Sequence, residues 1–247
     1  MKVYTQIIQA KADGKALFSI LIDPDKISVS FIQTFLDVCK NASVDLIFIG
    51  GSLIFDPDYH EKVKKIKQQA GSIPVLIFPG ALNQISANAD AILFLSLISG
   101  RNPDFLIGNQ VMAAPIIKKM AIETISTAYM LIESGKVTSA EFMSGSRPIP
   151  REKSDIAVAH ALAAELLGFK LVYLEAGSGA ELSVPITLID EISKNISIPI
   201  IVGGGIKSPG EASEKVQAGA DILVVGNHFE TKGNDSLIYE FADAIHG

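Results

Sequence analysis

The sequence Tyr173-Leu-Glu-Ala-Gly-Ser-Gly179 carries an apolar run into a glycine-rich turn, and the same junction occurs twice more. The second is Val202-Gly-Gly-Gly-Ile206 and the third is Val224-Val-Gly-Asn227. Glycine has no Cβ, so the backbone N–H groups of such turns can come close to a phosphate. In a barrel of alternating strands and helices, the loops after strands 7 and 8 form the usual phosphate site. The pattern therefore predicts a pocket for a phosphorylated small molecule.

Eight short segments are continuously apolar, as strands covered on both faces should be. They are residues 16–22, 46–49, 75–78, 91–95, 128–133, 171–175, 200–203 and 222–225. Helix patterns lie between most of them, and no linker or low-complexity run divides the chain. Alternation of eight strands with helices predicts one (β/α)8 TIM-barrel domain that spans residues 1–247.

Local signals place several of the helices. Residues 152–167 are rich in alanine and precede Gly168, a common helix stop. Residues 208–218 begin with a serine cap and a proline in the first turn. Ser28 is predicted to cap the helix that follows the first strand.

The connection between the third and fourth predicted strands is unusually short. A parallel crossover needs a dozen or more residues, usually a helix with two loops. Residues 79–90 leave scarcely enough room, and they begin with Pro79-Gly80, which breaks a helix. We therefore expect the third helix to be missing or reduced. The thin wall at this place would open a side groove for a long apolar substrate.

Composition excludes several classes of function. The chain has 247 residues, of which 48% are hydrophobic, with a net charge of -6 and a pI near 5.2. An acidic chain with scattered lysines is a poor candidate for nucleic-acid binding. One cysteine, Cys39, cannot form an internal disulfide, which together with the absence of a signal-peptide block predicts a cytoplasmic protein. The mean hydropathy of +0.35 indicates either a large core or an apolar surface. Such a surface would contact an apolar ligand, a partner subunit or a membrane.

Polar residues at the ends of the first two strands are candidate metal ligands. Asp23 and Asp25 follow the first strand, and Ser52 follows the second. Mg²⁺ favours one or two carboxylates together with phosphate oxygens of a substrate. Asp23-Pro-Asp25 is equally typical of a turn that caps a helix. From spacing alone, the two interpretations have the same weight.

Glu175 is the candidate catalytic base. A carboxylate within an apolar strand is rare without a partner, and this one precedes a glycine turn, where it would accept a hydroxyl proton. Tyr173 alternates onto the same face and would orient that hydroxyl. An aromatic side chain that only fills the barrel interior is the competing interpretation of Tyr173.

Several motifs, in chain order, match one known family over nearly the whole chain. They include Leu21-Ile-Asp-Pro-Asp-Lys26, Ile49-Gly-Gly-Ser52, Ser99-Gly-Arg-Asn-Pro-Asp104, Pro148-Ile-Pro-Arg151 and Leu171-Val-Tyr-Leu-Glu-Ala-Gly-Ser-Gly-Ala180. On these motifs the chain resembles the geranylgeranylglyceryl phosphate synthase family, which also includes heptaprenylglyceryl phosphate synthases. The Arg-Asn-Pro segment looks like the longer-chain, geranylgeranyl branch.

The resemblance implies a modified TIM barrel without its third helix. It implies Mg²⁺-dependent transfer of a prenyl group from a prenyl diphosphate to sn-glycerol 1-phosphate. By position, Asp23 and Ser52 match the metal-binding residues. The residues that match the glycerol phosphate site are Tyr173, Leu174, Glu175, Ala176, Gly177, Ser178, Gly179, Gly204, Gly205, Gly226 and Asn227. We expect a homo-oligomer, a dimer or a hexamer, with transient contact to a membrane surface for the lipid product.

Two other functions keep the phosphate pocket. A sugar-phosphate isomerase or aldolase would need an acid/base pair or a Schiff-base lysine at the strand ends. No predicted strand carries an interior lysine, which counts against the aldolase. A phosphate-ligand binder without enzymatic activity would leave Asp23 and Glu175 without a role.

Overall fold

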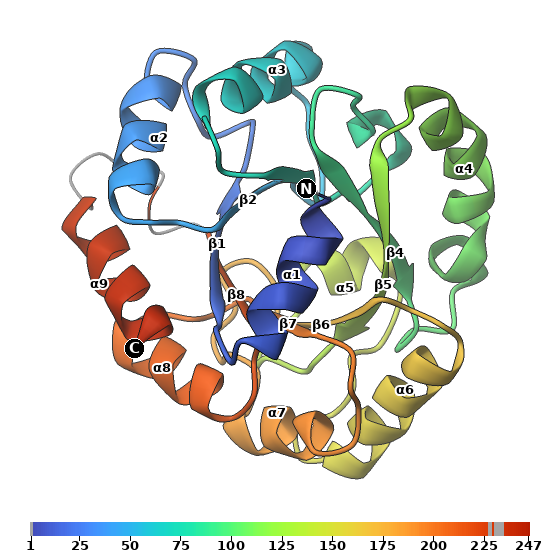
Figure 1. Ribbon diagram of the computed structural model, residues 1–247. Helices are drawn as coiled ribbons and strands as arrows, with labels where there is room; N and C mark the ends of the chain where they lie inside the picture. The colour runs from blue at the N-terminus through green and yellow to red at the C-terminus, as the bar shows by residue number, and fades with distance from the viewer. Residues whose placement is uncertain (1, 227–228, 230–234) are drawn as a thin grey trace.

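In a computed structural model, eight parallel strands close into a barrel with helices around it (Figure 1). The structure describes residues 2–226, 229 and 235–247. The strands follow chain order around the barrel, and β8 closes it against β1. Their bounds are β1 Leu17–Ile22, β2 Leu46–Ile49, β3 Val75–Ile77, β4 Ala91–Leu97, β5 Glu123–Leu131, β6 Leu171–Glu175, β7 Ile200–Gly203 and β8 Ile222–Val225. The predicted TIM-barrel class is confirmed.

The predicted start of the fifth strand is wrong. We placed it at residue 128, whereas β5 begins at Glu123. The first half of β5 is polar, so a search for continuous apolar runs misses it. Glu123 has a structural role there, because its carboxylate accepts hydrogen bonds from the backbone N–H groups of Val3 at 2.7 Å and Tyr4 at 3.0 Å. These residues begin helix α1, so β5 anchors that helix.

Helices cover the outside of the barrel and one of its ends. Their bounds are α1 Val3–Ala12, α2 Ile32–Asn41, α3 Tyr59–Gln69, α4 Asn109–Met120, α5 Ser139–Ser144, α6 Ser154–Leu166, α7 Ile186–Ser193, α8 Pro209–Gln217 and α9 Asp235–His246. A 3-10 turn, η1, spans Leu82–Gln84, and a π-helical turn, η2, spans Asp104–Gly108 before α4.

The cap predictions are confirmed at two helices and wrong at a third. The Ser208 hydroxyl accepts a hydrogen bond from the backbone of Glu211 at the start of α8. Gly168 follows α6 with a φ of +81°. Ser28 does not cap α2, because its carbonyl oxygen accepts the N–H of Phe31 in a preceding turn. The helix therefore begins only after Phe31, which offers no side-chain cap.

The third crossover is reduced to η1, as predicted. Between β3 and β4, the described chain forms this one three-residue turn in place of a full helix. The connection packs tightly on the loop after β2, since a Cβ on Gly80 would lie 2.4 Å from the carbonyl oxygen of Gly51. The wall of the barrel is thin here, and α4 is the next helix along the chain.

The buried side chains form two clusters, one on each side of the sheet. Successive strand residues point to opposite faces, so Phe18, Ile20 and Ile22 pack against the helices. The barrel interior is filled by the other set, which includes Phe48, Tyr173 and residues of α1. Helix α1 lies across the barrel end in Figure 1 and closes the base. No described helix is long and apolar enough to cross a membrane.

Candidate active site

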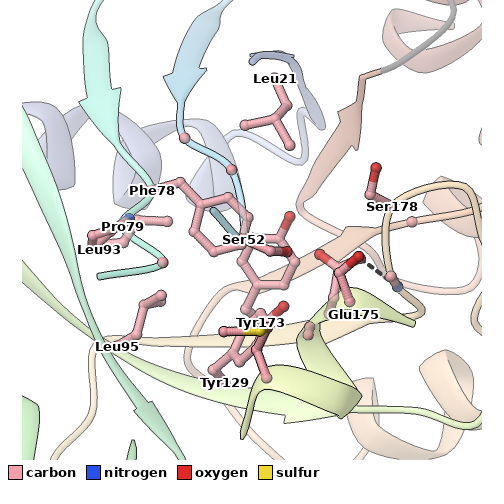
Figure 2. A pocket seen from close by; sticks show the side chains of 18 of the residues that line it. Leu21, Ser52, Phe78, Pro79, Leu93, Leu95, Tyr129, Tyr173, Glu175 and Ser178 are labelled. Atoms are coloured by element: carbon pink, nitrogen blue, oxygen red, sulfur yellow. Dashed lines mark hydrogen bonds between the residues drawn. The ribbon is translucent and has the colours of Figure 1, made fainter. Parts of the chain in front are cut away.

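A cavity of about 730 Å³ opens where the strands end. Its lining includes residues that directly follow four strands, namely Asp23, Gly50, Gly204 and Gly226. It therefore lies at the carboxyl ends of the strands, opposite α1, where TIM-barrel enzymes carry their active sites. Figure 2 shows Glu175 and Ser178 on one side of the cavity, with apolar side chains on the other.

Most of the residues predicted to bind glycerol phosphate line this cavity. They are Tyr173, Glu175, Gly177, Ser178, Gly179, Gly204, Gly205 and Gly226. Leu174 and Ala176 alternate to the opposite face and pack in the outer cluster instead. Asn227 lies outside the described residues.

The turns after β6 and β7 touch each other through their backbones. Gly177 and Gly204 have φ values of +100° and +83°, which favour glycine. A Cβ on Gly204 would lie 2.5 Å from the backbone nitrogen of Gly177, so only a glycine fits. Gly226 differs, because a Cβ there would meet Leu21 at an ordinary 3.5 Å. The fold requires the first two glycines, whereas it leaves room at Gly226 that a ligand can use.

Glu175 is buried at the end of β6, where it faces the cavity. It is 6% exposed, and its Oε1 accepts a 2.6 Å hydrogen bond from the backbone N–H of Gly177. Burial raises the pKa of Glu175 to about 7, although this hydrogen bond and Tyr173 act in the opposite direction. A carboxyl group with a pKa near neutrality is well suited to take up and release a proton.

Three aromatic rings lie beside Glu175. The ring of Tyr173 stacks on Phe78 with centroids 5.0 Å apart, and Tyr129 packs edge-on to both rings. The Tyr173 hydroxyl is buried close to the Glu175 carboxylate, and its geometry is not that of an ordinary hydrogen bond to any described residue. Burial, followed by the charge of Glu175, raises the pKa values of Tyr129 and Tyr173 well above the ordinary range. Both interpretations of Tyr173 are therefore compatible, since it fills the barrel interior and also lines the cavity.

Asp23 and Ser52 both line the cavity, from neighbouring loops. A Cβ on Gly51 would lie 3.5 Å from Oδ1 of Asp23, so the carboxylate adjoins the turn that carries Ser52. Asp23 also forms a 2.9 Å ion pair with Lys26. Among the described residues, no group of three or more His, Cys, Asp or Glu side chains could hold a metal ion. One carboxylate with a nearby hydroxyl does suit Mg²⁺, which keeps several waters and takes further oxygens from phosphates.

Asp25 has a structural role. Its carboxylate accepts hydrogen bonds from the backbone N–H groups of Phe55 at 2.9 Å and Asp56 at 3.0 Å. It thereby ties the loop after β1 to the loop after β2. The turn interpretation of the Asp-Pro-Asp motif holds for Asp23, because its Oδ1 accepts the backbone N–H of Asp25 at 3.1 Å. Asp23 also lines the cavity, so the turn and a ligand role are compatible there.

An apolar arm of the cavity runs toward the thin wall. Its lining comes from η1, β4 and α4, with Leu82, Ile85, Leu93, Leu95, Ala113 and Ile117. The short connection between β3 and β4 predicted a groove at this place. The α4 residues that line this apolar arm were not predicted. Their local sequence pattern does not show against which strands the helix packs.

Cationic side chains at the mouth were also missed by sequence reasoning. Lys26, Lys136 and Lys207 line the cavity from the loops after β1, β5 and β7. In the sequence they are scattered lysines, and only the closure of the barrel brings the three loops together. Their charges favour an anionic ligand in the mouth of the cavity.

Comparisons with known proteins agree with this geometry. The model of the PcrB family matches residues 6–245. A protein from Chitinophaga pinensis named geranylgeranylglyceryl phosphate synthase is 46% identical over 99% of this chain and 96% of its own length. One of the same name from Flavobacterium johnsoniae is 48% identical over 96% of both chains.

The fold is also that of a solved enzyme. The crystal structure of (S)-3-O-geranylgeranylglyceryl phosphate synthase from Thermoplasma acidophilum, in complex with sn-glycerol-1-phosphate, superposes with a TM-score of 0.93. The two sequences are 33% identical, and the match covers 100% of this chain and 99% of the other. The family match over residues 6–245 and the identities of the relatives show that this chain belongs to the PcrB family.

Proposed function

We propose that this protein is a prenyltransferase that joins a geranylgeranyl group to sn-glycerol 1-phosphate through an ether bond and releases diphosphate. The observation that carries the proposal is one cavity with two unlike ends. Glycine turns after β6 and β7 line one end together with Glu175, and an apolar arm beside η1 forms the other. The names of the relatives and the ligand of the Thermoplasma enzyme support the same pair of substrates.

The glycine turns would hold the phosphate of the acceptor. Backbone N–H groups of turns with positive φ form concave anion sites, and Gly204 and Gly205 have φ values of +83° and +70°. Helix α8 begins a few residues later at Pro209, so its positive end also faces this region. The acceptor would thus be fixed by its phosphate, with its glycerol part toward Glu175.

Glu175 would act as the general base. Its carboxylate takes the proton of the acceptor hydroxyl while the hydroxyl oxygen forms a bond to the allylic carbon of the prenyl diphosphate. The bond from that carbon to the diphosphate oxygen breaks, and its electron pair leaves with the diphosphate. A pKa of about 7 allows Glu175 to accept this proton near neutral pH and to return it to water afterwards.

Asp23 and Ser52 would hold Mg²⁺ together with the diphosphate. When bound, Mg²⁺ neutralises the negative charge that develops on the leaving group. The ammonium group of Lys26 already lies at Asp23, and Lys136 lines the same cavity from the loop after β5. These cations would also orient the diphosphate and balance its charge before and after transfer.

The aromatic rings and the apolar arm would receive the prenyl chain. Phe78, Tyr129 and Tyr173 lie next to Glu175, where the allylic carbon must approach the acceptor. Ring faces attract a carbon that carries partial positive charge. The remainder of the chain would extend past Leu93 and Leu95 toward η1, away from water.

We further propose that the protein forms a homo-oligomer, a dimer or a hexamer, and touches a membrane surface in the cytoplasm when it releases its product. The support is apolar exposure. Ile107, Val111, Met112 and Ile116 are exposed along η2 and α4, and Phe55 and Leu53 are exposed on the loop after β2. Such surfaces are typical of subunit or membrane contacts.

The test is a transfer assay with radiolabelled sn-glycerol 1-phosphate, Mg²⁺ and prenyl diphosphates of increasing length. We expect label in the organic extract, with the highest rate for geranylgeranyl diphosphate. Two matched controls are the enantiomer, sn-glycerol 3-phosphate, and the Glu175→Gln variant, which should both give little product. Purified, folded protein that forms no lipid with any of these donors contradicts the proposal.

The alternative sugar-phosphate aldolase finds little support. None of the eight described strands contains a lysine that could form a Schiff base in the barrel. A sugar phosphate would also leave the apolar arm empty. An isomerase or a phosphate-ligand binder would bind its ligand without Mg²⁺ and without a prenyl donor, which the same assay distinguishes.

A further inference from the structure

An ion pair with a buried ammonium group lies on α8, against the loops that follow β6 and β7. Lys215 and Glu211 are four residues apart on α8, and the ammonium of Lys215 lies 3.5 Å from the carboxylate of Glu211. Lys215 is only 1% exposed, and neither side chain lines the cavity. A charge removed from water is costly unless it is paired and hydrogen-bonded. An apolar residue at position 215 would avoid this cost, so packing alone does not account for the lysine.

The pair connects the loops that carry the two turns. Glu211 accepts hydrogen bonds from the hydroxyl of Ser183 and from the backbone N–H of Lys207, the latter at 2.9 Å. Lys215 donates a 2.8 Å hydrogen bond to the carbonyl oxygen of Val184. Ser183 and Val184 belong to the loop after β6, whereas Lys207 belongs to the loop after β7. One ion pair therefore holds both loops on α8.

The loops also contact each other directly. A Cβ on Gly205 would lie 3.1 Å from the backbone nitrogen of Ser183, so there is no spare room between them. The ammonium of Lys207 donates a 2.7 Å hydrogen bond to the carbonyl oxygen of Glu181. Arg151 donates to the carbonyl oxygens of Ser183 at 3.3 Å and Glu133 at 2.9 Å. A displacement at Ser183 is thus passed on to the glycine turns.

The Glu211 carboxylate is held in its charged form. Burial acts to raise the pKa of Glu211, but hydrogen bonds from Ser183 and Lys207 and the charge of Lys215 outweigh it, and the pKa lies below the ordinary value. Burial lowers the pKa of Lys215, and the charge of Glu211 opposes this change. Removal of Glu211 would leave the buried ammonium of Lys215 with only the carbonyl oxygen of Val184 as a hydrogen-bond acceptor among the described residues. Removal of Lys215 would leave Glu211 with its bonds to Ser183 and Lys207 but without the bond that joins α8 to Val184.

We propose that Lys215 and Glu211 are positioning residues that set the spacing of the two glycine turns, so that backbone N–H groups of both turns converge on the phosphate of the acceptor. This inference rests on the proposed function, because it takes the glycine turns as the phosphate site. The pair acts through the loops, since it does not touch the cavity. Loss of the pair should weaken acceptor binding more than it slows the transfer step at Glu175.

The first test is the kinetics of Lys215→Met, which keeps the length of the side chain and removes its charge. We expect the KM for sn-glycerol 1-phosphate to rise by about tenfold or more, with kcat changed less than about threefold, as for a loss of uniform binding. The KM for the prenyl diphosphate should stay the same. Lys215→Arg, which keeps the cation, should recover part of the affinity.

Lys11→Met is the matched control. Lys11 forms a 2.9 Å ion pair with Asp221 at the opposite end of the barrel, between α1 and the start of β8. Its loss should lower the melting temperature, as that of Lys215 does, but leave the KM for the acceptor unchanged. If both variants raise that KM equally, general destabilisation explains the effect and the proposal is wrong.

Hydrogen exchange of the ligand-free protein gives a second readout that needs no activity. The backbone amides of residues 177–184 should exchange faster in Lys215→Met and at the wild-type rate in Lys11→Met. A folded Lys215→Met protein with wild-type exchange in this segment and a wild-type KM overturns the proposal. If Lys215→Met does not fold, the KM for the acceptor and the hydrogen exchange of residues 177–184 are measured on Glu211→Gln instead, with the same outcomes supporting or overturning the proposal.

The two levels of the proposal can fail separately. If the wild-type protein neither binds nor consumes sn-glycerol 1-phosphate, the proposed function fails, and the phosphate role of the pair fails with it. If the wild-type protein binds the acceptor and the Lys215 and Glu211 variants bind it equally well, only the positioning role is lost.

Discussion

The backbone N–H of Gly177 donates a 2.6 Å hydrogen bond to Oε1 of Glu175, two residues earlier in the chain. The turn that would bind the phosphate therefore also fixes the carboxylate that would take the proton. One oxygen of Glu175 is held by the turn, so the rotation of the carboxylate is restricted. Acceptor binding and proton transfer are coupled through one short segment of β6 and its loop.

Glu175→Gln is expected to reduce turnover by about 10²–10⁴-fold, the usual contribution of a general base. The amide keeps the shape and can still accept the Gly177 hydrogen bond, but it cannot take up a proton. The affinity for the prenyl diphosphate should be almost unchanged. Steady-state kinetics and calorimetric titration of the same sample measure both quantities. Wild-type turnover in this variant would remove Glu175 from the mechanism.

The rate should depend on pH through Glu175. Because burial raises its pKa to about 7, the carboxylate becomes competent only as the pH approaches neutrality. We expect kcat/KM to increase about tenfold per pH unit below this value and to reach a plateau above it. In Glu175→Gln, the residual rate should follow only the ionisation of the substrate phosphate, near pH 6. An identical profile for both proteins would assign the inflection to another group.

Stability should change with pH in the opposite direction. The pKa of Glu175 is about 7 in the folded protein, against an ordinary value of 4.5. Between these values the folded state binds more protons, so the stability of the wild type falls as the pH rises through this window. Each tenfold difference in proton affinity between the folded and unfolded states corresponds to ~1.4 kcal/mol. The melting temperature of Glu175→Gln relative to wild type should therefore increase from pH 5 to pH 8. A constant difference across this range would show that burial imposes no such penalty.

Asp23→Asn should abolish transfer at limiting Mg²⁺ and leave the fold intact. The carboxylate is at the rim of the cavity, and its loss removes charge from the metal site without exposing the core. Ser52→Ala should have a smaller effect, because a hydroxyl is a weaker ligand. The readouts are the Mg²⁺ dependence of the rate and of diphosphate binding. Asp25→Asn is the comparison, and it should lower the melting temperature, since Asp25 bonds to the next loop.

Gly226→Ala offers a test of the phosphate pocket that does not disturb the fold. A Cβ at this position meets Leu21 at an ordinary 3.5 Å, whereas one on Gly204 would lie 2.4 Å from the Glu175 carboxylate. Gly226→Ala should keep the wild-type melting temperature and weaken binding of sn-glycerol 1-phosphate. Gly204→Ala should lower the melting temperature and also weaken this binding. Calorimetric titration decides, and unchanged affinity in Gly226→Ala would place the phosphate away from β8.

Much of the barrel could be predicted because its strands are buried on both faces. The bounds of β2, β6, β7 and β8 agree with the apolar runs, and the glycine turns follow directly from them. The first half of β5 was not predicted as strand because its residues are polar. At least one of them, Glu123, binds the backbone of helix α1 at the base of the barrel. A local pattern cannot show that a carboxylate in one strand binds a helix at the other end of the sequence.

The parts of the site that depend on how neighbouring strands and helices are paired could not be predicted from the sequence. Tyr129 meets Tyr173 because β5 and β6 pair these two residues directly, and nothing in either strand alone specifies that pairing. Lys215 and Glu211 have the spacing of an ordinary exposed pair on a helix. Only the position of α8 against the loops after β6 and β7 buries the lysine.

Helix α1 has a consequence for the order of folding. It precedes all eight strands in the sequence, yet Val3 bonds to Glu123, 120 positions later, and Lys11 bonds to Asp221, 210 positions later. Such distant contacts form slowly, because long loops must close first. Val3 and Ile7 on this helix therefore stay unburied until the later strands have formed the barrel interior. Chaperone dependence during folding should accordingly decrease when α1 is deleted, even though the folded barrel would then be open at its base.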